Sequence, residues 1–99
     1  MKAYQFTIPQ DKVTLEFEAG LAKGCGGFTR SIAVGAWINP EGKVEVEHVY
    51  LYQVALATET DHLGSFWLFK YVMDFATLAG ERAVHYGPVG NPHIYPTGN

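Results

Sequence analysis

The segment Asn39–Gly42, with the sequence NPEG, is the strongest local constraint on how this chain folds. Proline at its second position fixes the backbone angle that begins a tight turn, and glycine at its fourth position accepts the left-handed conformation that closes the turn. Two segments rich in β-branched and aromatic residues flank this turn, Phe28–Asn39 before it and Lys43–Leu56 after it. Their composition and the turn between them predict a β-hairpin. The turn also fixes the register, and the expected pairs are Ile38 with Val44, Ala36 with Val46, Val34 with His48, and Ile32 with Tyr50.

A second hairpin is expected nearer the N-terminus. The segments Lys2–Ile8 and Val13–Ala19 both alternate apolar and polar residues, and Pro9–Lys12 between them has the composition of a turn. Pairing across that turn places the apolar side chains of both segments on one face, as a half-buried hairpin requires. The glycine-rich segment Gly20–Gly27 (GLAKGCGG) then predicts a flexible connection to the next strand.

The hydrophobic period changes to that of an α-helix near Thr60. The polar residues of this helix form one narrow stripe, so most of its surface is apolar and is expected to be covered. Gly80 is the predicted end of the helix, and Ala83–Tyr86 predicts a short additional strand. The polar stripe consists of Lys70, Asp74, Thr77 and Glu81.

Together these segments predict an α+β fold, in which one long C-terminal α-helix packs on one face of an antiparallel sheet. The sheet is expected to have four to five strands, built from two β-hairpins. A chain of 99 residues is the usual size of one domain, and we assign residues 1–86 to a single α+β domain. Residues 87–99 are dense in proline and glycine and predict a Pro/Gly-rich C-terminal arm or tail without regular structure.

The charge distribution excludes several classes of function. The net charge is only −3, and the basic residues are scattered along the chain, which argues against nucleic-acid binding by phosphate neutralisation. No segment is apolar for long enough to span a membrane, and Met1–Phe6 lacks the continuous apolar core of a signal peptide. We therefore expect a cytoplasmic protein with no nucleic-acid and no membrane partner. The seven basic residues are Lys2, Lys12, Lys23, Arg30, Lys43, Lys70 and Arg82.

Cys25 is the only cysteine, so neither a disulfide within the chain nor a cysteine-based zinc site is expected. Its glycine neighbours favour an exposed thiol, but no histidine lies near it in the sequence to act as a base. The surrounding segment also lacks the GxxxxGK[ST] pattern of a phosphate-binding loop. We expect no metal and no cofactor, because the histidines lack metal-binding spacing. The four histidines are His48, His62, His85 and His93.

Two faces of the Lys43–Leu56 strand differ in character. Glu45 and Glu47 face away from the apolar row, so solvated charge is a better interpretation than an acid–base pair. Ala33, Gly35 and Trp37 of the preceding strand share that second face, which is therefore not purely polar.

The predicted register places His48, Tyr50 and Tyr52 in a row on the apolar face. Together with Trp67 from the helix, this row is a candidate small-molecule site, with aromatic walls and polar tips that fix the orientation of a ligand. The competing interpretation is a core histidine whose ring is satisfied by a tyrosine hydroxyl or a backbone group, or a strand end that emerges into solvent. We favour the core interpretation.

Two functional hypotheses remain. We favour a small non-enzymatic protein-interaction domain, because the chain has few charged residues and a surplus of aromatic residues. We expect this domain to form a homodimer and also to bind another protein. The expected interface residues are Trp37, Phe66 and Tyr71, and no catalytic residue is assigned. The alternative is a small-molecule-binding protein or small enzyme with a pocket between sheet and helix.

Overall fold

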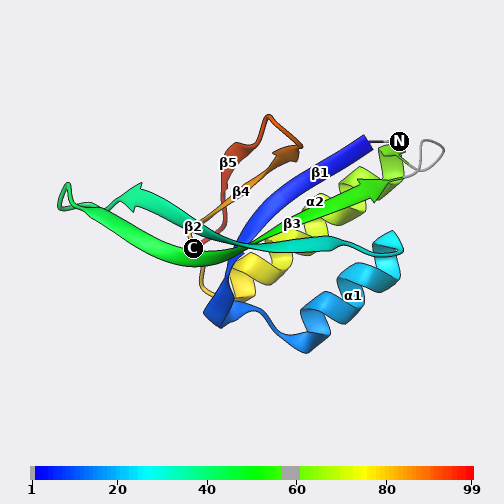
Figure 1. Ribbon diagram of the computed structural model, residues 1–99, viewed down its shortest axis with the longest axis horizontal. Coiled ribbons are helices and arrows are strands. Elements are labelled where there is room, and N and C mark those ends of the chain that lie inside the picture. Colours follow the sequence, from blue (N-terminus) through cyan, green and yellow to red (C-terminus); the bar gives the residue numbers. More distant parts are fainter. Residues whose placement is uncertain (1, 57–60) are drawn as a thin grey trace.

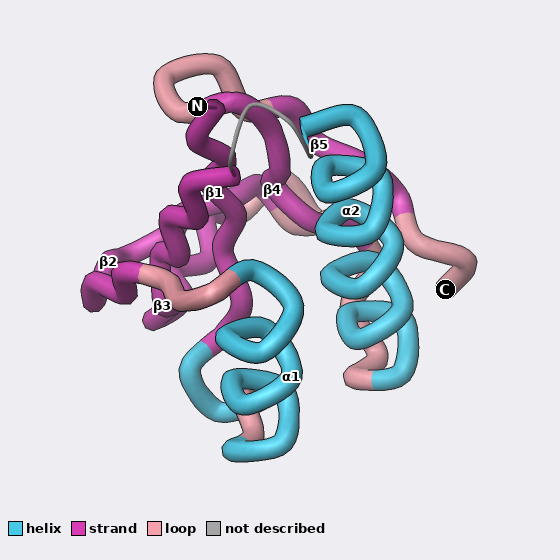
Figure 2. Tube along the Cα trace, turned by 90° about the vertical axis from the view of Figure 1, so that its right-hand side faces the viewer, coloured by secondary structure: helices cyan, strands magenta, loops and turns pink. Residues whose placement is uncertain are grey.

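The computed structural model describes residues 2–56 and 61–99, with side chains in the second range from residue 64 onward. Its sheet has five strands in the order β2-β3-β1-β4-β5, and each neighbouring pair is antiparallel. Two helices lie on the same side of this sheet (Figure 2), which confirms the α+β class and the antiparallel sheet. In chain order the elements are β1 (Lys2–Pro9), a 3-10 turn (Gln10–Lys12), α1 (Leu15–Cys25), β2 (Thr29–Ile38), β3 (Val44–Leu56), α2 (Asp61–Leu78), β4 (Ala83–Pro88) and β5 (His93–Pro96) (Figure 1).

The hairpin of β2 and β3 has the predicted register, and all the expected pairs are present. Gly42 has φ +81°, and its N–H donates to the carbonyl of Asn39 at 2.9 Å. The side-chain oxygen of Asn39 accepts from the N–H groups of Glu41 (3.0 Å) and Lys43 (2.9 Å). Local chemistry therefore determines the turn, and the turn determines the pairing.

The first predicted hairpin is wrong, because the segment Val13–Ala19 enters helix α1 instead of forming a strand. Thr14 is the N-cap: its side-chain oxygen accepts from the N–H of Phe17 at 3.1 Å. Glu16 and Glu18 follow in the first turn, where negative charge favours a helix. The described residues therefore form two α-helices rather than one long C-terminal helix, and α1 precedes the β2–β3 hairpin.

The glycine-rich segment is also helical up to Cys25, and this corrects its predicted role as a flexible connection. Gly20 and Gly24 are four residues apart and lie against α2, where a Cβ at either position would overlap the ring of Tyr71 or Trp67. Those two rings stack on each other with centroids 4.8 Å apart. The glycines thus leave room for the two aromatic rings of α2, so that α1 and α2 can pack closely against each other.

Strand β1 takes the centre of the sheet. It pairs with β3 on one side and with β4 on the other, so that Phe6 lies opposite both Tyr52 and Tyr86. These central positions face the helices and form the core. The residues of this core are Phe6, Ile8, Phe17, Leu21, Tyr52, Val54, Leu56, Leu68, Val72, Ala76, Val84 and Tyr86.

The chain leaves α2 as predicted and then returns to the sheet. Gly80 has φ +85°, and the N–H of Glu81 donates to the carbonyl of Ala76 at 2.9 Å, which closes the end of the helix. The short strand expected at Ala83–Tyr86 is present as β4. None of the helices formed by the described residues has the length and hydropathy needed to cross a membrane.

The C-terminal segment contains regular structure that the sequence did not predict. Within residues 87–99, β5 pairs with β4, and Tyr95 packs edge-on against Phe69 with ring centroids 5.0 Å apart. After β5, the N–H of Thr97 donates to the carbonyl of Arg82 at 2.9 Å. Prolines at the strand ends are compatible with β5 because it is an edge strand.

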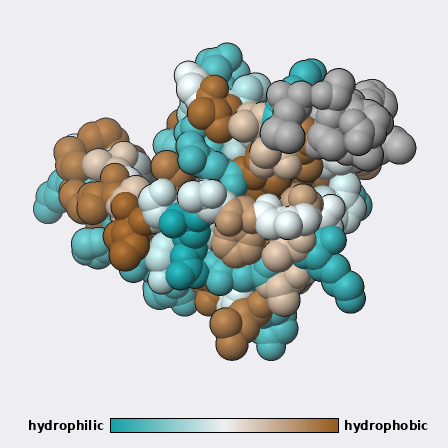
Figure 3. Space-filling model, turned by 45° about the vertical axis from the view of Figure 1, so that its right-hand side comes forward, coloured by the Kyte–Doolittle hydropathy of each residue, from teal (hydrophilic) through white to brown (hydrophobic). Residues whose placement is uncertain are grey.

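The far end of the β2–β3 hairpin extends beyond the helices, which do not cover it (Figure 1). Its apolar face is therefore exposed, although it continues the face that forms the core near β1. Figure 3 shows apolar side chains gathered at this end of the molecule, on the left. The exposed residues of this hairpin face are Ile32, Val34, Ile38, Val44 and Val46.

Candidate functional site

A groove lies on the face of the sheet that the helices leave open, and we call it the sheet groove. Its volume is about 620 Å³, within the range of small-molecule sites. All five strands contribute to it, together with the loop that follows α2. Its lining residues are Thr7, Pro9, Ala33, Val34, Gly35, Ala36, Trp37, Glu47, Val49, Leu51, Gly80, Glu81, Arg82, Ala83, His85 and Ile94.

Small residues on β2 leave space in this groove. Ala33 and Gly35 alternate along the strand and pair with Val49 and Glu47 of β3. A Cβ added at Gly35 would meet no atom closer than 3.9 Å, so the missing side chain leaves open volume instead of allowing a close packing contact. The apolar side chains of Val49 and Leu51 line the same surface.

Aromatic and charged groups line the groove as well. Trp37 is 49% exposed, so a large part of its indole surface is available to a ligand. Glu47, Glu81 and Arg82 add two carboxylates and one guanidinium. Burial raises the pKa of Glu81 above its ordinary value, and the charge of Glu47 raises it further. The charge on Lys12 has the opposite effect on this pKa, whereas that on Asp11 raises it.

The C-terminal residues hold the loop that carries Glu81 and Arg82. The hydroxyl of Thr97 donates to the carbonyl of Glu81 at 2.5 Å, and the side-chain amide of Asn99 donates to the same carbonyl at 3.0 Å. The Thr97 N–H bond to Arg82 adds a third connection. These bonds fix the backbone of the groove wall while leaving both charged side chains available.

A second polar cluster lies on the helix side of the sheet. The guanidinium of Arg30 contacts the carboxylate of Glu18 at 2.6 Å, and the hydroxyl of Tyr52 donates to the same carboxylate at 2.7 Å. The guanidinium carbon of Arg30 also lies 4.3 Å from the centre of the Tyr50 ring. Burial and the bond to Glu18 raise the pKa of Tyr52, so this phenol stays protonated. The cluster connects α1 to β2 and β3, and all its members are already paired.

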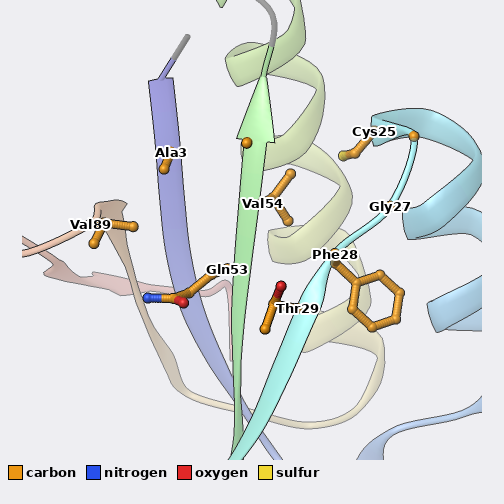
Figure 4. Close-up of a pocket in the computed structure, with 10 residues that line it drawn as sticks. Ala3, Cys25, Gly27, Phe28, Thr29, Gln53, Val54 and Val89 are labelled. Atoms are coloured by element: carbon orange, nitrogen blue, oxygen red, sulfur yellow. The ribbon is translucent and has the colours of Figure 1, made fainter.

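A shallower hollow of about 450 Å³ lies where α1 leads into β2. Figure 4 shows Cys25 and Phe28 near the end of α1, and Val89 on the other side beyond β1. Burial raises the pKa of the Cys25 thiol, so the thiol is less ionised than a free cysteine. This environment does not activate a nucleophile. Among the described residues, no group of three or more His, Cys, Asp or Glu side chains could hold a metal ion.

The predicted ligand residues lie in different parts of the helix side. Tyr50 and Tyr52 are neighbours, with ring centroids 6.3 Å apart, but Tyr52 is completely buried. His48 is exposed opposite Val34 on the extended part of the hairpin, so its favoured interpretation as a core histidine is wrong. Trp67 stacks on Tyr71 over α1. None of the four lines either of the two hollows described above.

The predicted interface residues are equally separated. Trp37 lines the sheet groove, whereas Phe66 is 70% exposed on α2. Tyr71 is half-buried between Trp67 and Phe17, and its hydroxyl donates to the carbonyl of Phe17 at 2.8 Å.

Sequence reasoning missed Glu47, Glu81 and Arg82 as candidate site residues. Glu47 was expected to be a solvated charge, although Ala33, Gly35 and Trp37 on the same face indicated an unusual surface. Glu81 and Arg82 reach that surface only because β4 pairs with the central strand β1. No local pattern in the sequence predicts that pairing.

No protein-family model matches the sequence, and no curated protein matches it. Among solved structures, a phage SAM lyase in complex with S-methyl-5'-thioadenosine matches with a TM-score of 0.59 and 11% sequence identity, over 94% of this chain and 85% of that chain. A phage SAM lyase in the apo state matches with a TM-score of 0.62 and 9% identity, over 98% of this chain and 90% of that chain. At these identities the likeness establishes a shared fold.

The comparisons correct the favoured functional hypothesis. We expected a non-enzymatic interaction domain, but the same architecture, over nearly the whole chain, is that of an enzyme. The residues that suggested surplus apolar surface include Trp37, which lines a groove, and Tyr71, which packs between the helices. The alternative hypothesis, a small-molecule-binding protein or small enzyme, agrees better with these findings.

Proposed function

We propose that this protein binds a sulfur-containing adenine nucleoside, S-adenosylmethionine or S-methyl-5'-thioadenosine, in the sheet groove. The observation that carries the proposal is the groove itself, which combines adequate volume with one exposed indole and charged groups. The ligand class is suggested by what the proteins of similar fold act on and bind. This proposal moves the expected pocket from between sheet and helix to the open face of the sheet.

The groups in the groove match the parts of such a ligand. The flat face of Trp37 is suited to stacking on an adenine ring, an interaction that contributes about 1–3 kcal/mol per base in other proteins. The guanidinium of Arg82 can pair with the carboxylate of S-adenosylmethionine. Ala33 and Gly35 leave room for the ribose and the sulfur substituents beside the sheet.

An enzymatic role would be cleavage of the bond between the sulfur of S-adenosylmethionine and the γ carbon of its methionine side chain. The electron pair of that bond passes to the sulfur, which leaves as neutral S-methyl-5'-thioadenosine, while the carboxylate of the same ligand attacks the carbon and closes a lactone. We assign the groove residues to binding and orientation of the ligand, and we assign no residue to bond cleavage. The proposal therefore separates into a binding claim and a turnover claim, which are measured independently.

Calorimetric titration with each nucleoside, at millimolar ligand if necessary, tests the binding claim. The blocking variant is Gly35→Val, which fills the groove without a steric contact at Cβ. Its matched control is Ser31→Val, on the same strand and face but outside the groove lining. We expect the wild type and the control to bind and the blocked variant to lose binding by about tenfold or more, equivalent to about 1.4 kcal/mol.

Binding that is equal in Gly35→Val and Ser31→Val would overturn the groove as the site, and absence of binding in the wild type would overturn the function. Chromatographic detection of S-methyl-5'-thioadenosine released from S-adenosylmethionine tests turnover. If S-methyl-5'-thioadenosine is released no faster than in buffer without protein, the turnover claim is wrong and only the binding claim stands.

A further inference from the structure

Two carboxylates of the sheet groove have no partner among the described residues. Glu47 comes from β3 and Glu81 from the loop after α2, and both are half-buried. No hydrogen bond or ion pair engages either carboxylate within residues 2–56 and 64–99. By contrast, Glu18 and Asp74 each contact a cationic side chain in this structure. The groove thus contains two carboxylates that make no direct hydrogen bond or ion pair with the described residues.

The two groups influence one another. The negative charge of Glu47 disfavours ionisation of Glu81, in the same direction as burial does. Asp11 adds to this repulsion and Lys12 opposes it, while Arg82 lines the groove without a described ion pair to either glutamate. A cation placed in the groove would relieve the repulsion between the two carboxylates, and a neutral group would not.

We propose that Glu47 and Glu81 make the sheet groove selective for a ligand with a positively charged sulfur, a sulfonium, over the corresponding neutral thioether. This inference rests on the proposed function, because it concerns the same groove and the same class of nucleoside. It adds specificity-determining residues, which the fold comparison alone does not provide.

The ligand pair S-adenosylmethionine and S-adenosylhomocysteine isolates this effect. The two differ by one methyl group and by the charge it places on sulfur, while the adenosine, ammonium and carboxylate groups are the same. A unit charge near two partly buried carboxylates should favour the sulfonium by about tenfold in Kd at low ionic strength. Added salt should reduce that preference, since the groove is open to solvent.

Titration of both ligands into the wild type, Glu47→Gln, Glu81→Gln and the double variant tests the proposal. Glutamine keeps the size and hydrogen-bonding capacity of the side chain while removing the charge. Glu16→Gln is the control, because it removes the same charge from an exposed side chain of α1, on the other face of the sheet. We expect the preference for the sulfonium to persist in the control, to weaken in each single variant, and to disappear in the double variant.

The outcomes separate this inference from the proposed function. If both ligands bind the wild type equally, or if the double variant keeps the preference, the inference is wrong and nucleoside binding stands. If neither ligand binds the wild type, the proposed function fails and the inference fails with it. Circular dichroism of each variant shows that a lost preference does not reflect unfolding.

Discussion

Gly20 of α1 lies against the hydroxyl of Tyr71 from α2, and a Cβ at Gly20 would overlap that hydroxyl oxygen. The same hydroxyl donates to the carbonyl of Phe17, one turn earlier in α1. The close approach of the two helices therefore depends on the absence of one methyl group. The contact between Gly20 and Tyr71 also explains why α1 contains glycine, although glycine is a poor helix former.

We expect Gly20→Ala to destabilise the fold by about 1–2 kcal/mol, because displacement of Tyr71 outweighs the better helix propensity of alanine. For a domain of this size, that change lowers the melting temperature by about 4 °C or more. Thermal unfolding followed by circular dichroism measures it.

The control for this variant is Gly64→Ala in α2, where an added Cβ meets its nearest neighbour, Leu56, at an ordinary 3.4 Å. We expect its melting temperature to stay unchanged or to rise. Equal stabilisation by the two substitutions would show that the helices are not in close contact at Gly20.

The β2–β3 hairpin and the segment before it show what the sequence could and could not predict. Asn39 and Gly42 specify their turn by local hydrogen bonding and a positive φ, so the pairing of β2 with β3 followed correctly. Val13–Ala19 also alternates, but Thr14 as an N-cap and the burial of Phe17 and Leu21 on one helix face decide its structure. A seven-residue alternation is compatible with both periods, and tertiary contacts determine the outcome.

The candidate site is less predictable from the sequence than the fold, because it is assembled from segments that are far apart along the chain. Its residues come from all five strands and one loop, and Glu81 approaches Glu47 only after β4 has paired with β1. Such non-local pairing leaves no periodic signal in the sequence. The sequence places Ala33, Gly35 and Trp37 on one face of the sheet, but it does not distinguish a groove on that face from a protein interface.

A second prediction concerns Tyr86, whose hydroxyl is buried and has no hydrogen-bond partner among the described residues. Tyr86→Phe should stabilise the protein by about 1 kcal/mol, because it removes a buried polar group that is not satisfied. Tyr52→Phe is the contrasting variant: it removes a 2.7 Å bond to Glu18 and should destabilise. Chemical denaturation of both variants measures the free energies, and a loss of stability in Tyr86→Phe would contradict the assignment.

The raised pKa of Glu81 predicts how stability depends on pH. Burial, and then the charge of Glu47, favour the protonated carboxyl in the folded state. The stabilising contribution of that carboxyl is therefore complete below its ordinary pKa of 4.5 and is lost as pH rises through the higher folded-state pKa. Glu81→Gln should consequently be more stable than the wild type at pH 7, and the two should converge at acidic pH. Melting curves that differ by the same amount at pH 4 and pH 7 would contradict this.

Self-association as a two-fold dimer also stays a prediction. The exposed hairpin face that includes Val34 and Val46 is the surface we expect a second copy to cover. Light scattering should give about twice the monomer mass of 10.9 kDa for the wild type. Val46→Lys should give the monomer mass, whereas Glu45→Lys, its neighbour on the other face, should not. A monomeric wild type at all concentrations would contradict the prediction.

The most direct test of the central claim, that the open face of the sheet binds a nucleoside, is an NMR titration of the isotope-labelled protein with S-methyl-5'-thioadenosine. We predict that the backbone amides of Ala33–Trp37, Glu47–Leu51 and Gly80–Ala83 shift together and saturate with one dissociation constant, while those of α1 remain in place. Shifts confined to the helices α1 and α2, or no shifts at millimolar ligand, would contradict the account.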